Sequence, residues 1–295
     1  MVWDHGYLAA FVFVAAILTE TVAIHSILPM LARGGAVREN YRGDLIPVGG
    51  GLTFPVTVLI GFIIVQLSMG YTGNRYGFYL IALLSMAFLG FIDDMLGQRD
   101  ALGFRGHFTR LLKKRELTTG GLKALGGGAV ALYISLFFSH TLIEFLVNVL
   151  VIALFTNSMN LFDLRPGRCV KVFFVLFLPL FLWSDADSLL FIPLAGAVLA
   201  YFPYDLKARV MMGDTGSNVL GVTLGVMAVF GLDFIVRVVL VVLLLLLHFY
   251  TERYSLSHVI ARNRFLNWLD WIGRSDGESG KQGKSVGGFS GLGED

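Results

Sequence analysis

Two neighbouring aspartates, Asp93 and Asp94, stand at the end of a long apolar run. Adjacent carboxylates repel each other, and one of them would ordinarily take up a proton. A divalent cation removes that cost, because Mg²⁺ prefers oxygen ligands, few protein carboxylates and the phosphates of a substrate. Solvated charge at a helix end is the plainer alternative. A metal site is favoured because a third aspartate, Asp214, is expected on the same face of the protein.

The segment around Asp214 reads Gly213-Asp214-Thr215-Gly216-Ser217 and precedes another apolar run. Glycines allow a backbone to approach a ligand closely, and free N–H groups at a helix start favour phosphate. We expect Ser217, or the asparagine after it, to cap the helix that follows. A simple glycine-containing turn with a cap is the alternative to a phosphate site.

A second polar segment, TNSMNLFDLRPGR, follows a different apolar run. Asn157, Asn160 and Asp163 are spaced by three and share one face if the helix continues through them. There they could hydrogen-bond a sugar, a base or water on the metal, whereas the alternative is capping of a loop. Arg165 and Arg168 are natural phosphate contacts, or ordinary positive charges of a cytoplasmic loop.

The composition places these residues in a membrane protein. Mean hydropathy is +0.73 and 15% of the 295 residues are charged, against roughly a quarter in soluble domains. The long uncharged runs predict an all-α, polytopic chain. A net charge of +2 gives no reason to expect a nucleic-acid partner, and the single cysteine excludes an intrachain disulfide. The predicted spans, about nine, lie near 7–31, 46–69, 77–95, 122–139, 141–156, 171–184, 188–203, 218–232 and 234–250.

The distribution of basic residues predicts the orientation. All Lys and Arg except Arg75 and Arg237 fall in or beside one set of long loops, which the positive-inside rule assigns to the cytoplasm. The N-terminus is then outside and the C-terminus cytoplasmic, in a multi-pass protein of the cell membrane. Residues 275–295, rich in Gly, Ser and Lys, are expected to be a disordered tail behind one transmembrane domain, 1–274. The segment 252–274 is either an amphipathic helix on the membrane surface or a helix packed on the domain.

Taken together, the motifs resemble those of the polyprenyl-phosphate N-acetylhexosamine-1-phosphate transferases, a superfamily that includes phospho-N-acetylmuramoyl-pentapeptide translocase. The order, spacing and predicted sidedness of the motifs match over roughly residues 40–260. The matching motifs are Pro47-Val48-Gly49-Gly50, Asp93-Asp94, Asn157-x-x-Asn160-x-x-Asp163 and Gly213-Asp214-x-Gly216-Ser217.

The resemblance implies an Mg²⁺-dependent enzyme of cell-envelope biogenesis, with Mn²⁺ as an alternative cofactor. A sugar-1-phosphate, here expected to be N-acetylhexosamine-1-phosphate, passes from a UDP-amino sugar to a membrane polyprenyl phosphate, and UMP is released at the cytoplasmic face. The same resemblance gives Asp93 and Asp214 to the metal and gives Asp94 the task of positioning or deprotonating the lipid phosphate. Phosphoryl transfer of this kind depends mainly on positioning and charge neutralisation.

The resemblance also implies a set of substrate-binding residues. Asn160 and Asp163 would bind the nucleotide, and Arg42 stands where the family often has a basic residue. The full set is Arg42, Asn157, Asn160, Asp163, Arg165, Arg168, Gly213, Gly216 and Ser217. A homodimer is one assembly state that the sequence leaves open.

Two departures from the family pattern concern the substrate. Pro166 occupies the place of a second aspartate that many relatives carry, and the histidine-rich cytoplasmic motif of better-known members is absent. The sequence therefore does not assign the chain to peptidoglycan synthesis. A cation- or proton-coupled transporter is the alternative that would best explain Glu20, an acid inside the first span. An inactive scaffold that binds the lipid carrier is the other.

Overall fold

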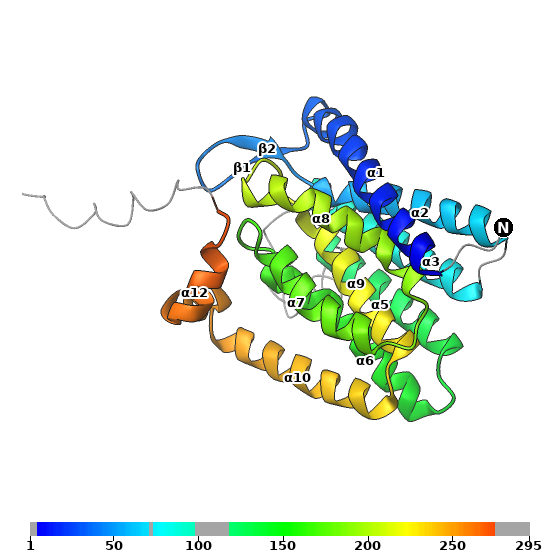
Figure 1. The fold of residues 1–295 in the computed structure, drawn as a ribbon. Coiled ribbons are helices and arrows are strands. Elements are labelled where there is room, and N and C mark those ends of the chain that lie inside the picture. Colours follow the sequence, from blue (N-terminus) through cyan, green and yellow to red (C-terminus); the bar gives the residue numbers. More distant parts are fainter. Residues whose placement is uncertain (1–4, 71–72, 98–117, 275–295) are drawn as a thin grey trace, which may run out of the picture.

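The structure is a computed structural model that describes residues 5–70, 73–97 and 118–274 (Figure 1). The predicted disordered tail, 275–295, lies outside these residues. The helices are α1 (His5–Arg33), α2 (Thr53–Met69), α3 (Asn74–Leu96), α5 (Thr119–Phe137), α6 (Leu142–Phe162), α7 (Arg168–Trp183), α8 (Ile192–Leu206), α9 (Gly213–Gly231), α10 (Phe234–Arg253), α11 (Leu256–Arg262) and α12 (Arg264–Trp271). The strands are β1 (Val37–Glu39) and β2 (Leu45–Pro47), and the short 3-10 helices are η1 (Gly50–Leu52) and η2 (Ser188–Leu190).

The chain is an all-α polytopic membrane protein, as the composition predicted. Six helices in the described part of the chain are long and apolar enough to cross a membrane: α1, α2 with the preceding η1, α3, α5, α6 and α10. The three other predicted spans coincide with α7, α8 and α9, which do not meet that criterion of length and composition. The total of nine spans and the sidedness of the termini stay predictions.

The second predicted span begins later than expected. Residues 45–47 form β2, which pairs antiparallel with β1, so that Val37 faces Pro47 and Glu39 faces Leu45. Gly49 then adopts a left-handed conformation with φ 75°, which a residue without Cβ tolerates best. The chain turns there into η1, and α2 starts at Thr53. The apolar run at 46–52 is therefore a hairpin strand and a turn.

Helix α9 runs through the middle of the bundle (Figure 1). Every residue from Thr215 to Phe230 is buried, and α9 packs most extensively against α6 and α3. Gly221 and Gly225 make the approach to α6 possible, because a Cβ at either position would overlap the backbone of α6. The start of α9 is thus fixed at the centre of one end of the bundle, which we call the site end.

Candidate functional site

The start of α9 is held by a side chain from α3. The Asp94 carboxylate accepts from the backbone N–H of Asp214 and of Thr215, each at 2.9 Å, and from the Thr215 hydroxyl at 2.5 Å. These amides belong to the first turn, where a helix has no internal acceptors. Asp94 is only 7% exposed. It therefore caps α9 from a different element.

This arrangement corrects two expectations about the Gly213–Ser217 segment. The helix begins at Gly213, so Ser217 lies within the helix and does not cap it. The N–H groups of the first turn were expected to be free for phosphate. Those of Asp214 and Thr215 are taken by Asp94, and that of Gly213 bonds to Asp163.

Glycines bring three elements to the start of α9. Gly90 of α3 lies against the backbone of Asp214, and a Cβ there would overlap it. Gly51 of η1 lies against Gly216 in the same way. The N–H groups of residues 50 and 51 donate to the carbonyls of residues 211 and 212 at 3.0 and 3.1 Å. Close backbone contact therefore explains why Gly216, predicted to bind substrate, is a glycine.

Asp93 and Asp214 form a pair of carboxylates beside a cation. Their carboxyl groups lie within hydrogen-bonding reach of each other. The Lys123 ammonium of α5 donates to Asp214 Oδ2 at 2.5 Å, with the two side chains 19% and 31% exposed. The cation offsets part of the repulsion between the two carboxylates. Lys123 is not among the site residues predicted from the sequence, in which it stands beside a long basic loop.

The donors at Asp93 and Asp214 fit a hard divalent cation. Both are carboxylates that can reach one point, and both keep access to solvent at the site end. Within the described ranges, no group of three or more His, Cys, Asp or Glu side chains is arranged to hold a metal by itself. Mg²⁺ is bound in many enzymes by one or two carboxylates and by substrate phosphates, so the pair suffices for that mode.

Asn160 is fixed to α9. Helix α6 continues through Phe162, so Asn157 and Asn160 share its last turns, as the sequence predicted conditionally. The Asn160 side chain donates to Asn218 Oδ1 at 2.9 Å and accepts from the Ser217 hydroxyl. Asn160 and Ser217 therefore join α6 to the first turns of α9, next to Asp214.

Asp163 ends α6 among other acids. Burial raises the pKa of Asp163 well above its usual value, and the negative charges of Asp205, Asp214 and Asp94 raise it further. Asp205, at the end of α8, accepts from the backbone N–H of Gly167 at 3.0 Å and is buried. Asp205 is not among the residues predicted from the sequence, where its only signal is an acid at the end of an apolar run.

Arg168 points away from this cluster. Its Nε and Nη2 donate to the two carboxylate oxygens of Asp270 in α12 at 2.8 and 2.9 Å, and its Nη1 donates to Ser257 at 2.9 Å. The side chain is buried. A phosphate could replace these partners only if α12 moved, so the predicted phosphate contact is at odds with this geometry. We leave Arg168 out of the proposed site.

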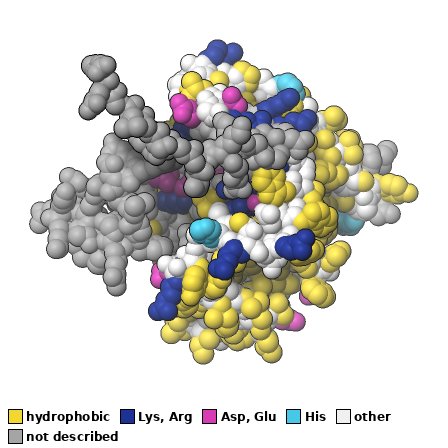
Figure 2. Space-filling model, turned by 90° about the vertical axis from the view of Figure 1, so that its left-hand side faces the viewer, with side chains coloured by type: hydrophobic (Ala, Val, Ile, Leu, Met, Phe, Trp, Pro, Cys, Tyr) yellow, Lys and Arg dark blue, Asp and Glu magenta, His cyan; other side chains and the backbone are white. Residues whose placement is uncertain are grey.

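The two other arginines predicted to bind substrate lie at the surface of the site end, which Figure 2 shows with Lys, Arg, Asp and Glu side chains on it. Arg42 is exposed in the turn between β1 and β2, with its guanidinium 5.1 Å from the ring centroid of Tyr41. Arg165 is exposed after α6. Arg38 of β1, which the sequence analysis did not single out, donates to the backbone carbonyl of Asp94 at 2.5 Å.

Glu20, the acid inside α1, lies away from these residues. It is fully buried, and its Oε2 accepts from the Thr57 hydroxyl at 2.6 Å. This bond joins α1 to α2 within the bundle.

Comparison with known proteins gives a family match. The family model described as "Glycosyl transferase family 4" matches residues 76–232, just over half of the chain. The matched range holds both aspartates of α3, the end of α6 and the start of α9.

Curated relatives are identical to the chain at between a quarter and a third of the aligned positions. A phospho-N-acetylmuramoyl-pentapeptide-transferase of Acetivibrio thermocellus is 27% identical, over 74% of this chain and 72% of the relative. Proteins of the same name from Clostridium botulinum and Staphylococcus haemolyticus are 28% and 26% identical. The matches cover 59% and 70% of this chain, and 56% and 72% of those proteins.

Proposed function

Because the chain belongs to glycosyl transferase family 4, we propose that it transfers a sugar-1-phosphate from a UDP-sugar to a membrane polyprenyl phosphate and releases UMP. The relatives bear the name phospho-N-acetylmuramoyl-pentapeptide-transferase, which supports a transfer of this general kind. Within the proposal, the sugar is an N-acetylhexosamine and the site end faces the cytoplasm. The sequence identity with these relatives is below a third, so the proposal does not assign this chain to their pathway.

One observation carries the proposal: Asp93 and Asp214 form a carboxylate pair at the start of the buried helix α9, and Asp214 is ion-paired with Lys123. Phosphoryl transfer needs positioned charge more than it needs a covalent catalyst. A pair of carboxylates with a neighbouring ammonium offers positioned charge of both signs. It stands at the end of a membrane bundle, where a lipid phosphate and a soluble nucleotide can meet.

We assign Mg²⁺ to Asp93 and Asp214, with Mn²⁺ as the alternative. When bound, the cation would offset negative charge on the diphosphate and on the departing UMP. The protein groups hold the reactants around it. Lys123, which donates to Asp214, would contact a phosphate oxygen of the bound substrate. Arg42 and Arg165 are exposed cations at the same end and would meet the remaining phosphate charge.

The reaction exchanges one phosphorus–oxygen bond for another. An oxygen of the lipid phosphate bonds to the β-phosphorus of the UDP-sugar, and the bond from that phosphorus to the bridging oxygen breaks. UMP departs with the electron pair. A lipid phosphate is already ionised near neutral pH, so a strong base is not required. Within the proposal, Asp94 acts mainly by holding α9, while Asn160 and Asp163 line the nucleotide side together with Asn157.

The experiment is a turnover assay on the purified full chain. The protein is supplied with Mg²⁺, polyprenyl phosphate and a panel of labelled UDP-sugars, and UMP and labelled lipid are measured. We expect product with at least one UDP-N-acetylhexosamine, and none from Asp214→Asn. Turnover by Asp214→Asn at the parent rate would refute the site assignment. Absence of product with every sugar would refute the proposed reaction.

A further inference from the structure

Helix α12 has two faces, and the apolar one points outward. Phe265, Trp268, Leu269 and Ile272 follow the helical spacing of one face and are 63%, 60%, 38% and 45% exposed. We call these four residues the apolar stripe. An amphipathic helix of a globular domain normally turns such a stripe toward the core. Here the stripe is left uncovered by the described part of the chain.

The polar face of α12 makes the contact with the bundle. Asp270 accepts a two-pronged contact from Arg168 and a further bond from Arg274 at 2.9 Å. Lys171 of α7 donates to the backbone carbonyls of Leu269 and Asp270 at 3.0 and 2.8 Å. Paired Arg–carboxylate contacts of this kind are strong and directional. They fix the rotation of α12, so the outward direction of the stripe is set by buried ion pairs.

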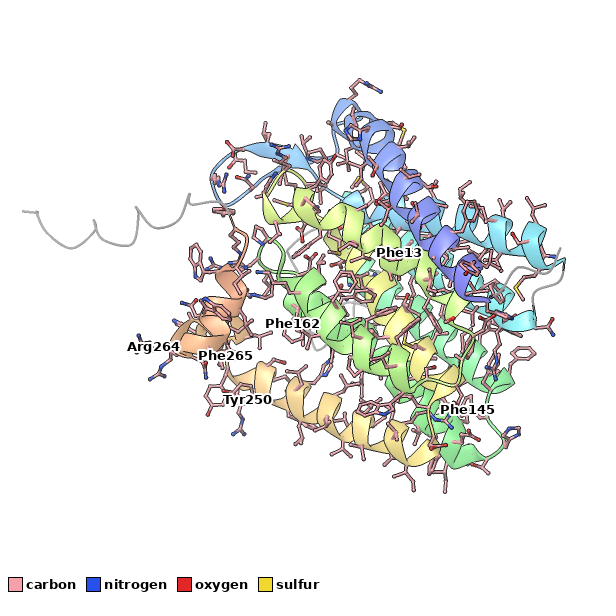
Figure 3. All side chains as sticks on the ribbon, in the orientation of Figure 1. Phe13, Phe145, Phe162, Tyr250, Arg264 and Phe265 are labelled. Carbon is pink, nitrogen blue, oxygen red and sulfur yellow. The ribbon has the colours of Figure 1, made fainter. Side chains whose placement is uncertain are left out.

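The apolar stripe lies near the exposed apolar surface of a helix that is able to span a membrane. Helix α10 is among the helices able to span a membrane, and Leu246, Phe249 and Tyr250 near its end are exposed. Only residues 254–263 separate α10 from α12. Figure 3 shows Tyr250, Phe265 and Arg264 at this same end, with Arg264 extending away from the bundle. The stripe is therefore close to the membrane boundary.

The charges beside the stripe identify the kind of surface it fits. Arg253, Arg262 and Arg264 are exposed around the stripe, with Glu252 as the acid among them. Aromatic residues with flanking arginines are typical of helices that lie in the interface of an anionic bilayer. A water-facing helix would not need four large apolar residues on its exposed side.

We propose that α12 is a membrane-surface helix whose apolar stripe lies in the headgroup region of an anionic bilayer, with Arg262 and Arg264 at the lipid phosphates. The ion pairs of Asp270 then connect the lipid surface to the start of α7. That start directly follows Gly167, whose N–H bonds to Asp205 beside Asp163. The membrane contact thereby holds the loop between α6 and α7 in place.

The test measures the depth of α12 in a bilayer and does not depend on turnover. Single-cysteine variants of the full chain, made in a Cys169→Ala background, carry a small fluorophore at Phe265→Cys or Trp268→Cys. Glu39→Cys, an exposed position of β1 at the site end, is the matched control. Each protein is placed in nanodiscs of phosphatidylcholine alone and in anionic nanodiscs of phosphatidylcholine with phosphatidylglycerol, with one copy per disc and, in a separate series, two. Quenching by lipids with brominated chains is compared with quenching by aqueous iodide.

We expect brominated lipid to quench the two stripe labels at least about twofold more than the control label, and iodide to show the opposite order. In the anionic discs, Arg262→Gln and Arg264→Gln should each lower the quenching of the stripe labels by brominated lipid by about fivefold. Neither substitution should change this quenching in discs of phosphatidylcholine alone. Iodide quenching of the stripe labels at the control level would overturn the proposal. Protection of the stripe only in discs with two copies would overturn it as well, in favour of a dimer contact.

Discussion

Replacing Asp94 with asparagine tests whether this residue acts mainly by holding α9. The carboxylate accepts three hydrogen bonds, from the part-buried amide of Asp214 and from the buried amide and hydroxyl of Thr215. An asparagine has one side-chain oxygen and one NH₂ group at these positions. Whichever way the amide is turned, at least one N–H of the first turn of α9 then faces another donor.

The size of the effect follows from these contacts. A hydrogen bond to a charged group contributes about 1.5–3 kcal/mol, and an unsatisfied buried donor costs about 1–3 kcal/mol. The neutral amide is cheaper to bury than the carboxylate, which offsets part of the loss. We expect Asp94→Asn to lower the free energy of unfolding by about 2–4 kcal/mol. The corresponding fall in Tm is about 4–8 °C.

The assay is thermal unfolding of the purified protein in detergent, with turnover measured on the same samples. Asp214→Asn is the matched control, because it removes one carboxylate from a repelling pair and leaves the α9 cap intact. We expect Asp214→Asn to lose product with a Tm within about 2 °C of the parent, whereas Asp94→Asn loses both. A parent-like Tm for Asp94→Asn would refute the capping role and return Asp94 to a purely chemical one.

Three further predictions concern packing, a buried acid and pH. Gly51→Ala should lower turnover and should lower the unfolding free energy by about 1–3 kcal/mol, because its Cβ would overlap Gly216. Turnover and thermal unfolding measure the two effects. Gly128→Ala, where a Cβ meets open space, is the control and should change neither. Glu20→Ala should destabilise the protein by about 1–3 kcal/mol more than the Gln variant, which keeps an acceptor for the threonine hydroxyl; equal Tm values would contradict this. Burial opposes ionisation of Asp270, but the bonds and charges of the two arginines beside it outweigh burial and lower its pKa below 3.8. A lowered pKa gives stability that is fully present above pH 3.8 and is lost as pH falls through the folded value. The protection of α12 against hydrogen exchange, relative to the intrinsic exchange rate at each pH, should therefore hold above pH 3.8 and fall below it.

The fold was largely predictable because the membrane simplifies the problem. Long apolar runs must become helices, since a bilayer offers no partners for backbone groups. The predicted spans accordingly coincide with helices to within a few residues, apart from the starts of α2 and α9 and the end of α6, which continues to Phe162. The two starts lie in glycine-containing segments, where a third element decides the conformation: β1 pairs with residues 45–47, and Asp94 caps the turn that starts at Gly213.

Part of the candidate site was also predictable from residue type alone. Acids at the ends of apolar runs are costly, so Asp93, Asp94, Asp163 and Asp214 were visible as exceptions. Asp205 was an equal exception, but it had no neighbouring motif to mark it. Lys123 resembles any other loop cation until the packing of α5 against α3 and α6 brings its ammonium to Asp214.

The sequence by itself determined a membrane bundle with acidic and glycine-rich segments at helix ends, because hydrophobicity and residue type are local properties. Only the tertiary structure decided which partner each charge meets. Asp94 and Asp93 are adjacent, yet the helix turn directs one into the cap of α9 and the other toward Asp214. Arg168, read as a phosphate contact, meets Asp270. Such pairings depend on the rotation and crossing of helices, which no single helix encodes.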